Sequence, residues 1–471
     1  MSLTPVTAAP VPDARQPIDH QLAGGRAYPR YVLALLTVTL VLSLVDRQVI
    51  NILAEPISRA LKLKDWQIGL MSGFAFAIFY TSFGFPMAWL AERRSRPAII
   101  AGSLATWALF TALGGLARNF TQLLLARTGV GIGEAGCIPP AHALISDYFP
   151  PERRATALAI YHLGVPIGGL LGLTLGGVIA DAYGWRAAFA IVGAPGLIVA
   201  AIAFLTLKER RDRPLVGPGA SSPAFRGLAD VIRYLRAKRS FWLVSLAAGT
   251  QAFIAYGHAP FGIIYFLRAH GRELTAIAAG FGLKPAGFLG LSIGLISGVA
   301  GVVGTLLGGV IADRAARRDA RAYCTIPAVA SLAAMPLTMA VYLVPSAPAA
   351  LALLALPALL TSFWLGPVYA IEQGIAPPTM RATTSAILLF ILNSIGLGLG
   401  PLCVGLLSDT LAGRFRLGAA EGVRWALVLS SLLSIVVFAL FWAARKTIRA
   451  DMWSDRDERG PARQHAANPG S

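Results

Sequence analysis

Residues Leu123–Gly136, LLLARTGVGIGEAG, place an arginine and a glutamate in a stretch that is otherwise apolar. Arg127 and Glu134 are seven residues apart, which is about two turns of an α-helix, so a helix places both on one face. An ionised group at the centre of a bilayer costs about 2.5–3.5 kcal/mol on insertion scales. Such charges persist where they are paired or face a water-filled pathway. The stretch therefore predicts a membrane protein with polar chemistry at its centre.

The composition supports this prediction. Of the 471 residues, 56% are hydrophobic and only 14% are charged, and the mean hydropathy is +0.64. The net charge of +18 would suggest nucleic-acid binding in a water-soluble protein. In a membrane protein, Lys and Arg gather in cytoplasmic loops instead, so we expect no nucleic-acid partner. Cys137, Cys324 and Cys403 lie in apolar stretches, which indicates packing residues and no metal site.

Apolar runs of roughly 20–28 residues follow one another along the chain, the length that a tilted helix needs to cross a bilayer. They predict an all-α membrane protein with twelve transmembrane helices in two pseudo-symmetric six-helix bundles. The predicted spans are 30–53, 66–91, 97–117, 120–147, 154–180, 186–206, 240–268, 286–312, 322–344, 348–372, 380–407 and 422–444.

The remaining segments complete the predicted organisation. Residues 1–28 are rich in Pro and Ala and lack the apolar core of a signal peptide, so we expect a disordered tail. The bundles would occupy 29–206 and 240–445, and a linker at 207–239 would carry an amphipathic helix on the membrane surface. Residues 446–471 would form a second tail. The distribution of Lys and Arg predicts that both termini are cytoplasmic.

The two predicted bundles repeat each other in sequence. GGVIADRAARR at 308–318 corresponds to MAWLAERRSR at 87–96, and PTMRATTSAI at 378–387 corresponds to PERRATALAI at 151–160. Asp181 and Asp409 close the fifth helix of each set. A duplicated six-helix unit is typical of a rocker-type transporter with its site between the halves.

These repeats resemble the loop motif of the major facilitator superfamily, Gly-x-x-x-Asp-Arg-x-Gly-Arg-Arg. The second copy matches at Gly309, Asp313, Arg314, Arg317 and Arg318, with Ala316 in place of Gly. The first copy is degraded and keeps Glu92, Arg93 and Arg96. The resemblance covers essentially all of residues 30–445 and implies an ion-pair latch at the inner face.

Within that superfamily the chain resembles the Spinster-like transporters. The residues that carry this resemblance are Asp46 and Arg47 in the first helix, the run from Arg127 to Ala135 in the fourth, and Pro166 and Gly168 in the fifth. Animal Spinster-like proteins are associated with export of sphingosine-1-phosphate and lysophospholipids. The resemblance implies an amphiphilic, single-chain, lipid-like substrate.

The run Gly131–Gly136 also matches the dinucleotide fingerprint G-x-G-x-x-G. That fingerprint needs a preceding strand and a helix that begins at it. Here we expect it inside one continuous apolar helix over 120–147, where small residues allow close approach of a neighbouring helix. No GxxxxGK[ST] motif occurs. We therefore expect no cofactor and no enzymatic activity.

The charged residues of the predicted spans are assigned roles by their chemistry. Glu134 is the best proton carrier, with Asp46 as a second carboxylate of the same site. Arg127 cannot realistically deprotonate, so it is the fixed counter-charge or the anchor for an anionic head group. Arg47, about 100° around the helix from Asp46, either pairs elsewhere or serves the same head group. The alternative for Arg127 and Glu134 is a buried pair that only stabilises packing.

Two further sets of residues are weaker candidates. A first set flanks the inner helix ends, where we expect ion pairs that form and break as the cytoplasmic side closes and opens: Glu92, Arg93, Arg96, Asp147, Arg154, Asp313, Arg314, Arg317, Glu372 and Arg381. A second set could line a cavity but is equally typical of helix packing: Tyr80, His142, His162, Gln251, Tyr256, His258, Trp364 and Asn393.

The sequence thus predicts a secondary transporter of a bacterial inner membrane that acts as a monomer by alternating access. Its partners would be an amphiphilic substrate, protons and the lipid bilayer. One alternative is a proton-coupled importer of a small organic anion, whose carboxylate Arg127 could bind equally well. A second alternative is a membrane receptor on a transporter fold that does not transport.

Overall fold

The structure, a computed structural model, describes residues 27–209, 228–378 and 380–453, and every regular element in these ranges is helical. The first half contains α1 (Ala27–Leu61), α2 (Asp65–Gly69), the π-helix η1 (Leu70–Phe74), α3 (Ala75–Arg93), α4 (Arg96–Gly114), α5 (Phe120–Glu134), α6 (Ile138–Tyr148), α7 (Pro151–His162) and α8 (Gly164–Thr206). Residues 1–26 and 454–471 of the two predicted tails lie outside the described residues.

The second half begins with the short helix α10 (Leu228–Arg236). It continues with α11 (Arg239–Ala269), α12 (Gly271–Gly280), α13 (Pro285–Ala316), α14 (Ala322–Leu343), α15 (Ala347–Leu360), α16 (Leu365–Ile375), α17 (Arg381–Ile391), the π-helix η2 (Leu392–Leu399), α18 (Gly400–Gly413), α19 (Ala419–Ser431), α20 (Leu433–Ala444) and α21 (Ile448–Asp451). Helix α10 lies in the segment predicted as a linker, and the predicted position of this helix on the membrane surface stays a prediction.

Within the described ranges, nine helices are long and apolar enough to cross a membrane. One of them, Thr156–Thr206, is 51 residues long and contains two predicted spans. The two spans meet at Gly184, where φ is 84°, a backbone conformation that glycine adopts without the steric penalty other residues incur. The all-helical, multi-span architecture is confirmed, whereas the count of twelve spans stays a prediction.

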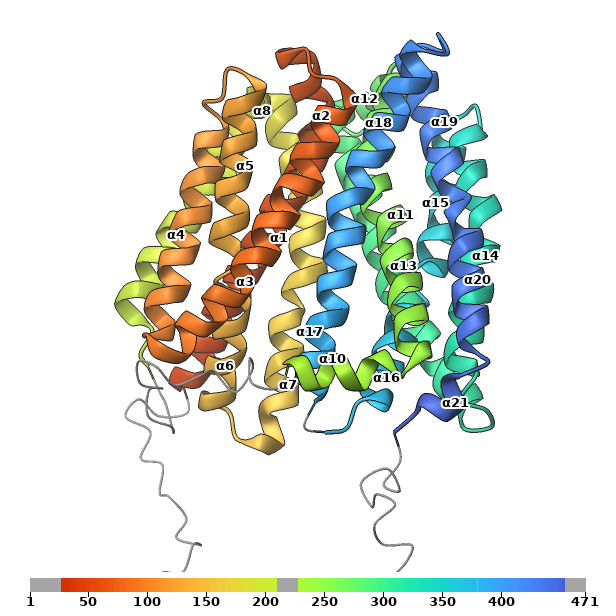
Figure 1. Ribbon diagram of the computed structural model, residues 1–471. Helices are drawn as coiled ribbons and strands as arrows, with labels where there is room; N and C mark the ends of the chain where they lie inside the picture. The colour runs from red at the N-terminus through yellow and green to blue at the C-terminus, as the bar shows by residue number, and fades with distance from the viewer. Residues whose placement is uncertain (1–26, 210–227, 379, 454–471) are drawn as a thin grey trace, which may run out of the picture.

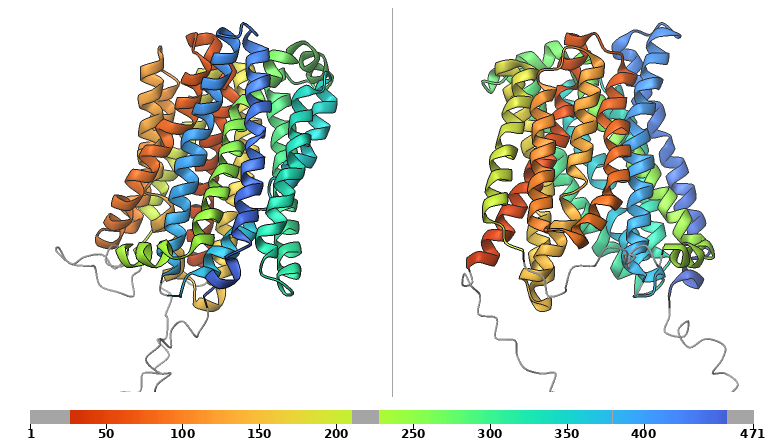
Figure 2. Two further views of the ribbon diagram at one scale, coloured as in Figure 1. Left: turned by 45° about the vertical axis from the view of Figure 1, so that its right-hand side comes forward. Right: turned by 60° about the vertical axis from the view of Figure 1, so that its left-hand side comes forward.

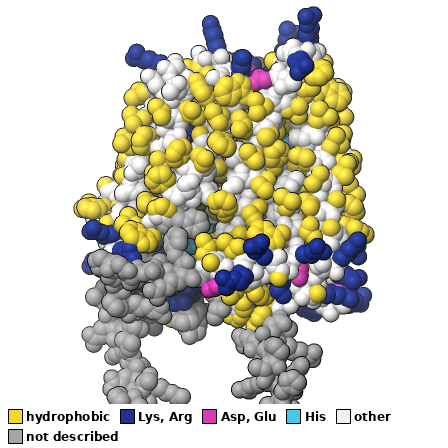
Figure 3. All heavy atoms as spheres, in the orientation of Figure 1, with side chains coloured by type: hydrophobic (Ala, Val, Ile, Leu, Met, Phe, Trp, Pro, Cys, Tyr) yellow, Lys and Arg dark blue, Asp and Glu magenta, His cyan; other side chains and the backbone are white. Residues whose placement is uncertain are grey.

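The long helices lie side by side in a single bundle (Figure 1). Helices α2 and α12 lie at one end, while α10 crosses the other end, near α21 (Figures 1 and 2). The viewed face is largely apolar between two rims that carry Lys and Arg (Figure 3). We call the rim with α10 the α10 end and the other the α2 end.

The continuous helix predicted over 120–147 is wrong. Helix α5 ends at Glu134 and α6 begins at Ile138, with a turn between them. The cause is the Pro139–Pro140 pair, because proline has no N–H and its ring clashes with the carbonyl four residues earlier. Glu134 is therefore the last residue of α5.

Glycines let α1 and α8 approach closely. A Cβ atom at Gly172 would lie 2.7 Å from the carbonyl oxygen of Val45 and 2.9 Å from its Cα. A Cβ at Gly169, three residues earlier on α8, would meet nothing within 4 Å. The hydrophobic effect does not drive helices together inside a bilayer, because the lipid is as apolar as the side chains. Small residues at the interface allow close approach, so the helices gain van der Waals contacts instead.

This pair of glycines gives a matched test of packing. Gly172→Ala should destabilise the protein by about 1–3 kcal/mol, since the added methyl group forces α1 and α8 apart. Gly169→Ala should be neutral or slightly stabilising, because alanine is the better helix former. Thermal unfolding of both variants in detergent measures the difference. Equal midpoints would contradict the close-packing account.

Candidate functional site

Two ion pairs join α1 to α5 in the first half. Arg127 Nη1 lies 3.1 Å from Asp46 Oδ2, and Arg47 Nε donates to Glu134 Oε2 over 2.6 Å. Arg47 Nη2 lies 2.5 Å from the same Glu134 oxygen. Adjacent residues of α1 thus reach two residues of α5 that are about 10 Å apart along the helix axis.

This geometry corrects one prediction. Arg127 and Glu134 do lie on the side of α5 that faces α1, but they do not pair with each other. Their seven-residue separation is too large for direct contact, so each pairs with the oppositely charged residue of α1. Asp46 and Glu134 lie close enough for their charges to interact, so the four groups form one electrostatic cluster.

The Asp46–Arg127 pair is sealed from water. The exposed fraction of the side chain is 0% for Asp46 and 3% for Arg127. Thr111 of α4 donates a hydrogen bond of 2.7 Å to the second oxygen of Asp46, so both carboxylate oxygens have partners. A buried ion pair whose carboxylate oxygens are both hydrogen-bonded holds its helices together. Opening it is costly because it would leave buried charges without partners.

The Arg47–Glu134 pair is more open. The Arg47 side chain is 22% exposed, although that of Glu134 is fully buried. The guanidinium lies 4.8 Å from the ring centre of Phe76 and 4.7 Å from that of Tyr80, so aromatic faces partly replace its water. Ser43 donates to Glu134 Oε2 over 3.0 Å, whereas Oε1 has no hydrogen-bond partner among the described residues.

A cavity of about 340 Å³ lies mainly within the second half, and neither Arg47 nor Glu134 lines it. Gln48 of α1 and Leu173 of α8 contribute from the first half, and the rest of the wall comes from α11, α13, α14, α15 and the residues that follow α15. The wall is mostly apolar, with polar groups from Gln251, His258 and Tyr342. This combination, at this volume, is typical of a small-molecule site.

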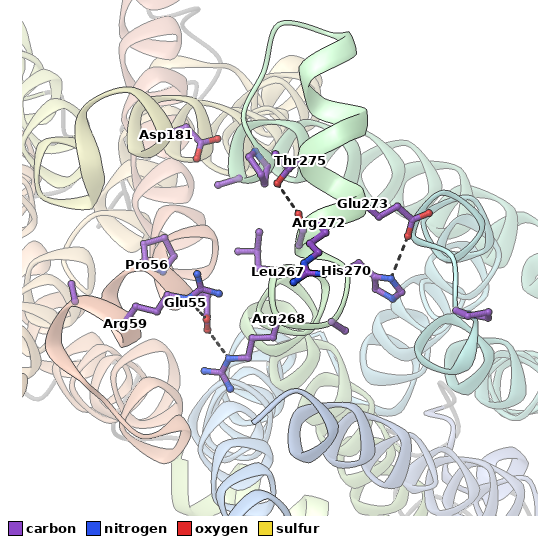
Figure 4. A pocket seen from close by; sticks show the side chains of 16 residues that line it. Glu55, Pro56, Arg59, Asp181, Leu267, Arg268, His270, Arg272, Glu273 and Thr275 are labelled. Carbon is purple, nitrogen blue, oxygen red and sulfur yellow. Dashed lines mark hydrogen bonds and ion pairs between the residues drawn. The ribbon is translucent and has the colours of Figure 1, made fainter. Parts of the chain in front are cut away.

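At the α2 end, charged side chains hold the halves together. Arg268 of α11 donates to Glu55 Oε2 over 2.8 Å and forks onto both oxygens of Asp65 at 2.9 and 3.0 Å. Ser408 of α18 donates to the same carboxylate over 2.6 Å. These contacts line or border a surface cleft of about 1070 Å³, in which Glu55 and Arg268 point toward each other (Figure 4).

Two aspartates strengthen this closure in a symmetric way. Asp409 of α18 accepts from the backbone N–H groups of Asp65 and Trp66 at the start of α2, over 3.1 and 2.8 Å. Asp181 of α8 accepts from the backbone N–H of Gly287 near the start of α13, over 2.6 Å. A carboxylate at a helix N-terminus satisfies unpaired donors and complements the helix dipole. Each half therefore caps a helix of the other.

The sequence profile described as Major Facilitator Superfamily matches residues 36–401. The chain belongs to the major facilitator superfamily. It is 33% identical to an MFS-type efflux pump of Mycolicibacterium smegmatis over 94% of this chain and 98% of that protein. It is 27% identical to protein spinster homolog 3 of Danio rerio over 85% of this chain and 80% of that protein. It is 25% identical to the hexuronate transporter of Bacillus subtilis over 81% and 89% of the two chains.

Solved structures agree with this membership. A bacterial homolog of the human lysosomal transporter Spinster, inward-facing and unoccupied, matches with a TM-score of 0.80 and 32% identity over 92% of this chain and all of that one. The same homolog in an inward-facing, occupied conformation matches with a TM-score of 0.78. The protein is thus a Spinster-like transporter of the superfamily and not an enzyme.

The superfamily loop motif and its neighbours lie at the α10 end. Arg96 of α4 forms an ion pair with Asp147 of α6, which joins two helices of the same half, so their role in a gate between the halves stays a prediction. Arg154 donates to the Ser146 carbonyl, and Asp313 accepts from Tyr323. Arg381 donates to the Ala376 carbonyl, Glu372 accepts from Ser385 and Gln373, Arg93 stacks on Trp89, and Arg314 and Arg317 are exposed. The Glu92 side chain is outside the described residues.

The weaker cavity candidates divide into three groups. Gln251 and His258 line the cavity. Tyr80 contacts Arg47, and Tyr256 of α11 lies close enough to interact with both. His142 and His162 pack against each other with ring centres 5.1 Å apart, while Trp364 and Asn393 are half-buried.

Sequence reasoning missed Thr111, Ser43 and the closure of Arg268 on Glu55 and Asp65. None of these residues is unusual for the helix that contains it. Each one acquires a role only through its contact with a residue of another helix. The one available signal was the repeat itself, which already paired Asp181 with Asp409.

The unequal burial of the two ion pairs gives a prediction about stability. Asp46→Asn should cost about 3–5 kcal/mol, because it leaves the Arg127 charge buried and unpaired. Glu134→Gln should cost clearly less, since Arg47 keeps its access to water and its aromatic contacts. Unfolding midpoints in detergent measure both losses. The double variant Asp46→Asn/Arg127→Gln should recover part of the stability, and a purely additive loss would contradict the pairing.

Proposed function

We propose that this transporter moves an amphiphilic, lipid-like molecule by alternating access and uses the proton gradient through Glu134. The observation that carries the proposal is the asymmetry of the two ion pairs. One carboxylate, Asp46, has all its oxygens occupied and no contact with water. The other, Glu134, has a free oxygen and a partner that reaches water.

This asymmetry assigns different tasks to the four charges. The Asp46–Arg127 pair fixes α1 against α5 and stays formed. The Arg47–Glu134 pair is the exchangeable one: a proton on Glu134 neutralises its charge and releases Arg47 to an anionic head group. Loss of the proton restores the pair and displaces the head group. Arg127 and Arg47 were both predicted as candidates for the head group, and we assign this role to Arg47.

The cavity supports an amphiphile as the substrate. Its apolar wall, with Leu173, Ile254 and Phe266, would hold an alkyl chain, and Gln48, which also lines it, follows Arg47 directly in sequence. A head group at Arg47 and a chain in this cavity fit one extended molecule that bridges the two halves.

A second candidate substrate is a small organic anion. Its support is the same partly exposed side chain of Arg47, which would bind a carboxylate without a chain, together with the similarity to the hexuronate transporter. Liposomes loaded with a labelled lysophospholipid or with labelled glucuronate separate the two candidates. Counterflow of only the sugar acid would exclude the lipid proposal.

We assign the observed state as inward-facing. Among the described residues, the polar contacts between the two halves lie at the α2 end. With the termini, the linker and the α10 end in the cytoplasm of a bacterial cell, as the Lys and Arg distribution predicts, the closed end faces outward. The proposal treats the single chain as the functional unit.

The proton role of Glu134 is tested by a neutral variant. Glu134→Gln should retain counterflow of the transported substrate but lose accumulation driven by a pH gradient, because its side chain no longer titrates. Proton uptake on addition of substrate, followed with a pH dye inside liposomes, should disappear as well. Glu421→Gln, which removes an exposed carboxylate paired with Arg424, serves as the control. Unchanged pH-driven accumulation in the Glu134 variant would overturn the role.

The closure at the α2 end is tested by distances. Arg268→Gln removes the ionic contacts to Glu55 and Asp65 and should shift the protein toward the outward-open state; a loss of about 1.4 kcal/mol changes the ratio of two states tenfold. Spin labels at the exposed positions Arg118 and Arg414, one in each half, should gain a longer distance component. Arg424→Gln breaks an ion pair within one half and should leave the distances unchanged. Identical distributions in both variants would contradict this closure.

A further inference from the structure

Basic side chains gather on the second half at the α10 end. Arg236, Lys238 and Arg239 lie where α10 passes into α11, and Arg445 and Lys446 follow the end of α20. Ser240 donates to Asp451 over 2.7 and 2.6 Å through its backbone and hydroxyl groups, which brings the start of α11 to α21. We call these five residues the basic edge. Figure 3 shows Lys and Arg in a row along this rim, directly beside an apolar surface.

The protein itself occupies the apolar face of α10. Val231 and Leu235 are buried, the Tyr234 hydroxyl donates to the Ile375 carbonyl over 2.9 Å, and Trp242 Nε1 donates to the Leu235 carbonyl over 2.9 Å. The helix is therefore held against the bundle and does not insert into lipid. Its exposed residues are Ala229, Asp230, Ile232, Arg233 and Arg236, and because Asp230 pairs with Arg233, Arg236 leaves this face with a net positive charge.

Exposed aromatic side chains lie beside the basic edge. Trp242 and Trp442 are both substantially exposed, and the Arg445 guanidinium lies 3.9 Å from the ring centre of Trp442. Lys238 lies 5.3 Å from the ring centre of Tyr234. Tryptophan beside Lys or Arg is typical of the level of lipid head groups, where an amphipathic ring has both an apolar and a polar neighbour.

The acidic residues close to the basic edge are already engaged. Asp230 pairs with Arg233 at 3.1 Å, Asp451 accepts from Ser240, and Asp319 pairs with Arg449 at 2.8 Å. Within the described ranges, Arg236, Arg239 and Lys446 form no ion pair and are exposed. The edge therefore carries uncompensated positive charge at head-group level.

We propose that the basic edge binds the head groups of anionic phospholipids in the leaflet that it faces. This inference does not depend on the substrate or on proton coupling. A phosphodiester head group supplies the charge that the edge lacks, and its acyl chains continue onto the adjacent apolar surface. Each basic residue near an anionic membrane surface contributes about a fivefold gain in affinity. Loss of two of them should therefore weaken binding roughly twenty-five-fold.

The test counts bound lipids on the full-length protein. Native mass spectrometry with added phosphatidylglycerol or phosphatidylcholine should show preferential phosphatidylglycerol adducts on the unmodified protein. Arg236→Gln/Arg239→Gln should remove most of that preference, whereas Arg236→Lys/Arg239→Lys should keep it. High salt should weaken the preference, because exposed charges are screened.

A matched control uses the opposite rim. Arg118→Gln/Arg414→Gln removes the same charge from exposed positions at the α2 end and should leave most adducts in place. An equal loss in this control would mean that net charge alone attracts the lipid, and the proposal would fail. Undiminished phosphatidylglycerol binding in the Arg236/Arg239 glutamine variant would overturn it as well.

Discussion

The structure depends on how four charges are buried between α1 and α5. Each would be costly alone in a bilayer, and together they are stable because two cations face two anions at 2.5 to 3.1 Å. The arrangement is not symmetric. Thr111 donates a hydrogen bond to the second carboxylate oxygen of Asp46, whereas Oε1 of Glu134 has no hydrogen-bond partner among the described residues. We therefore assign a structural role to the Asp46–Arg127 pair, which stays formed, and a switching role to the Arg47–Glu134 pair, which can open.

The contacts between the halves have a different character. At the α2 end they are made by side chains that bind the other half through charge and through backbone N–H groups, as Asp409 and Asp181 do. Such contacts are strong but local, so they can separate without disturbing the apolar packing inside each half. This is what a rocking transporter needs: rigid halves joined by a small number of polar contacts. The superfamily membership and the likeness to inward-facing Spinster structures agree with this design.

The sequence by itself determined the class of the fold and the identity of the charged residues. Hydrophobic run length predicted a multi-span helical protein, since a bilayer sets the length of a spanning segment. The duplicated loop segments and the aspartates Asp181 and Asp409 gave the internal repeat. Because burying a charge in a bilayer is costly, the four charged residues within the predicted spans were identified as candidate functional residues: Asp46, Arg47, Arg127 and Glu134. These inferences depend on local periodicity and composition, and both can be read from a single sequence.

Only the tertiary structure decided which charges pair. Spacing placed Arg127 and Glu134 on one face of a helix, but their partners depend on the register between α1 and α5, which no local pattern contains. The same holds for Arg268, whose partners are more than two hundred residues away. The break after Glu134 was missed because apolar periodicity continues through 120–147 although Pro139 and Pro140 interrupt the hydrogen bonding. Pairing, closure and cavity shape are products of packing, and packing is set by the whole chain.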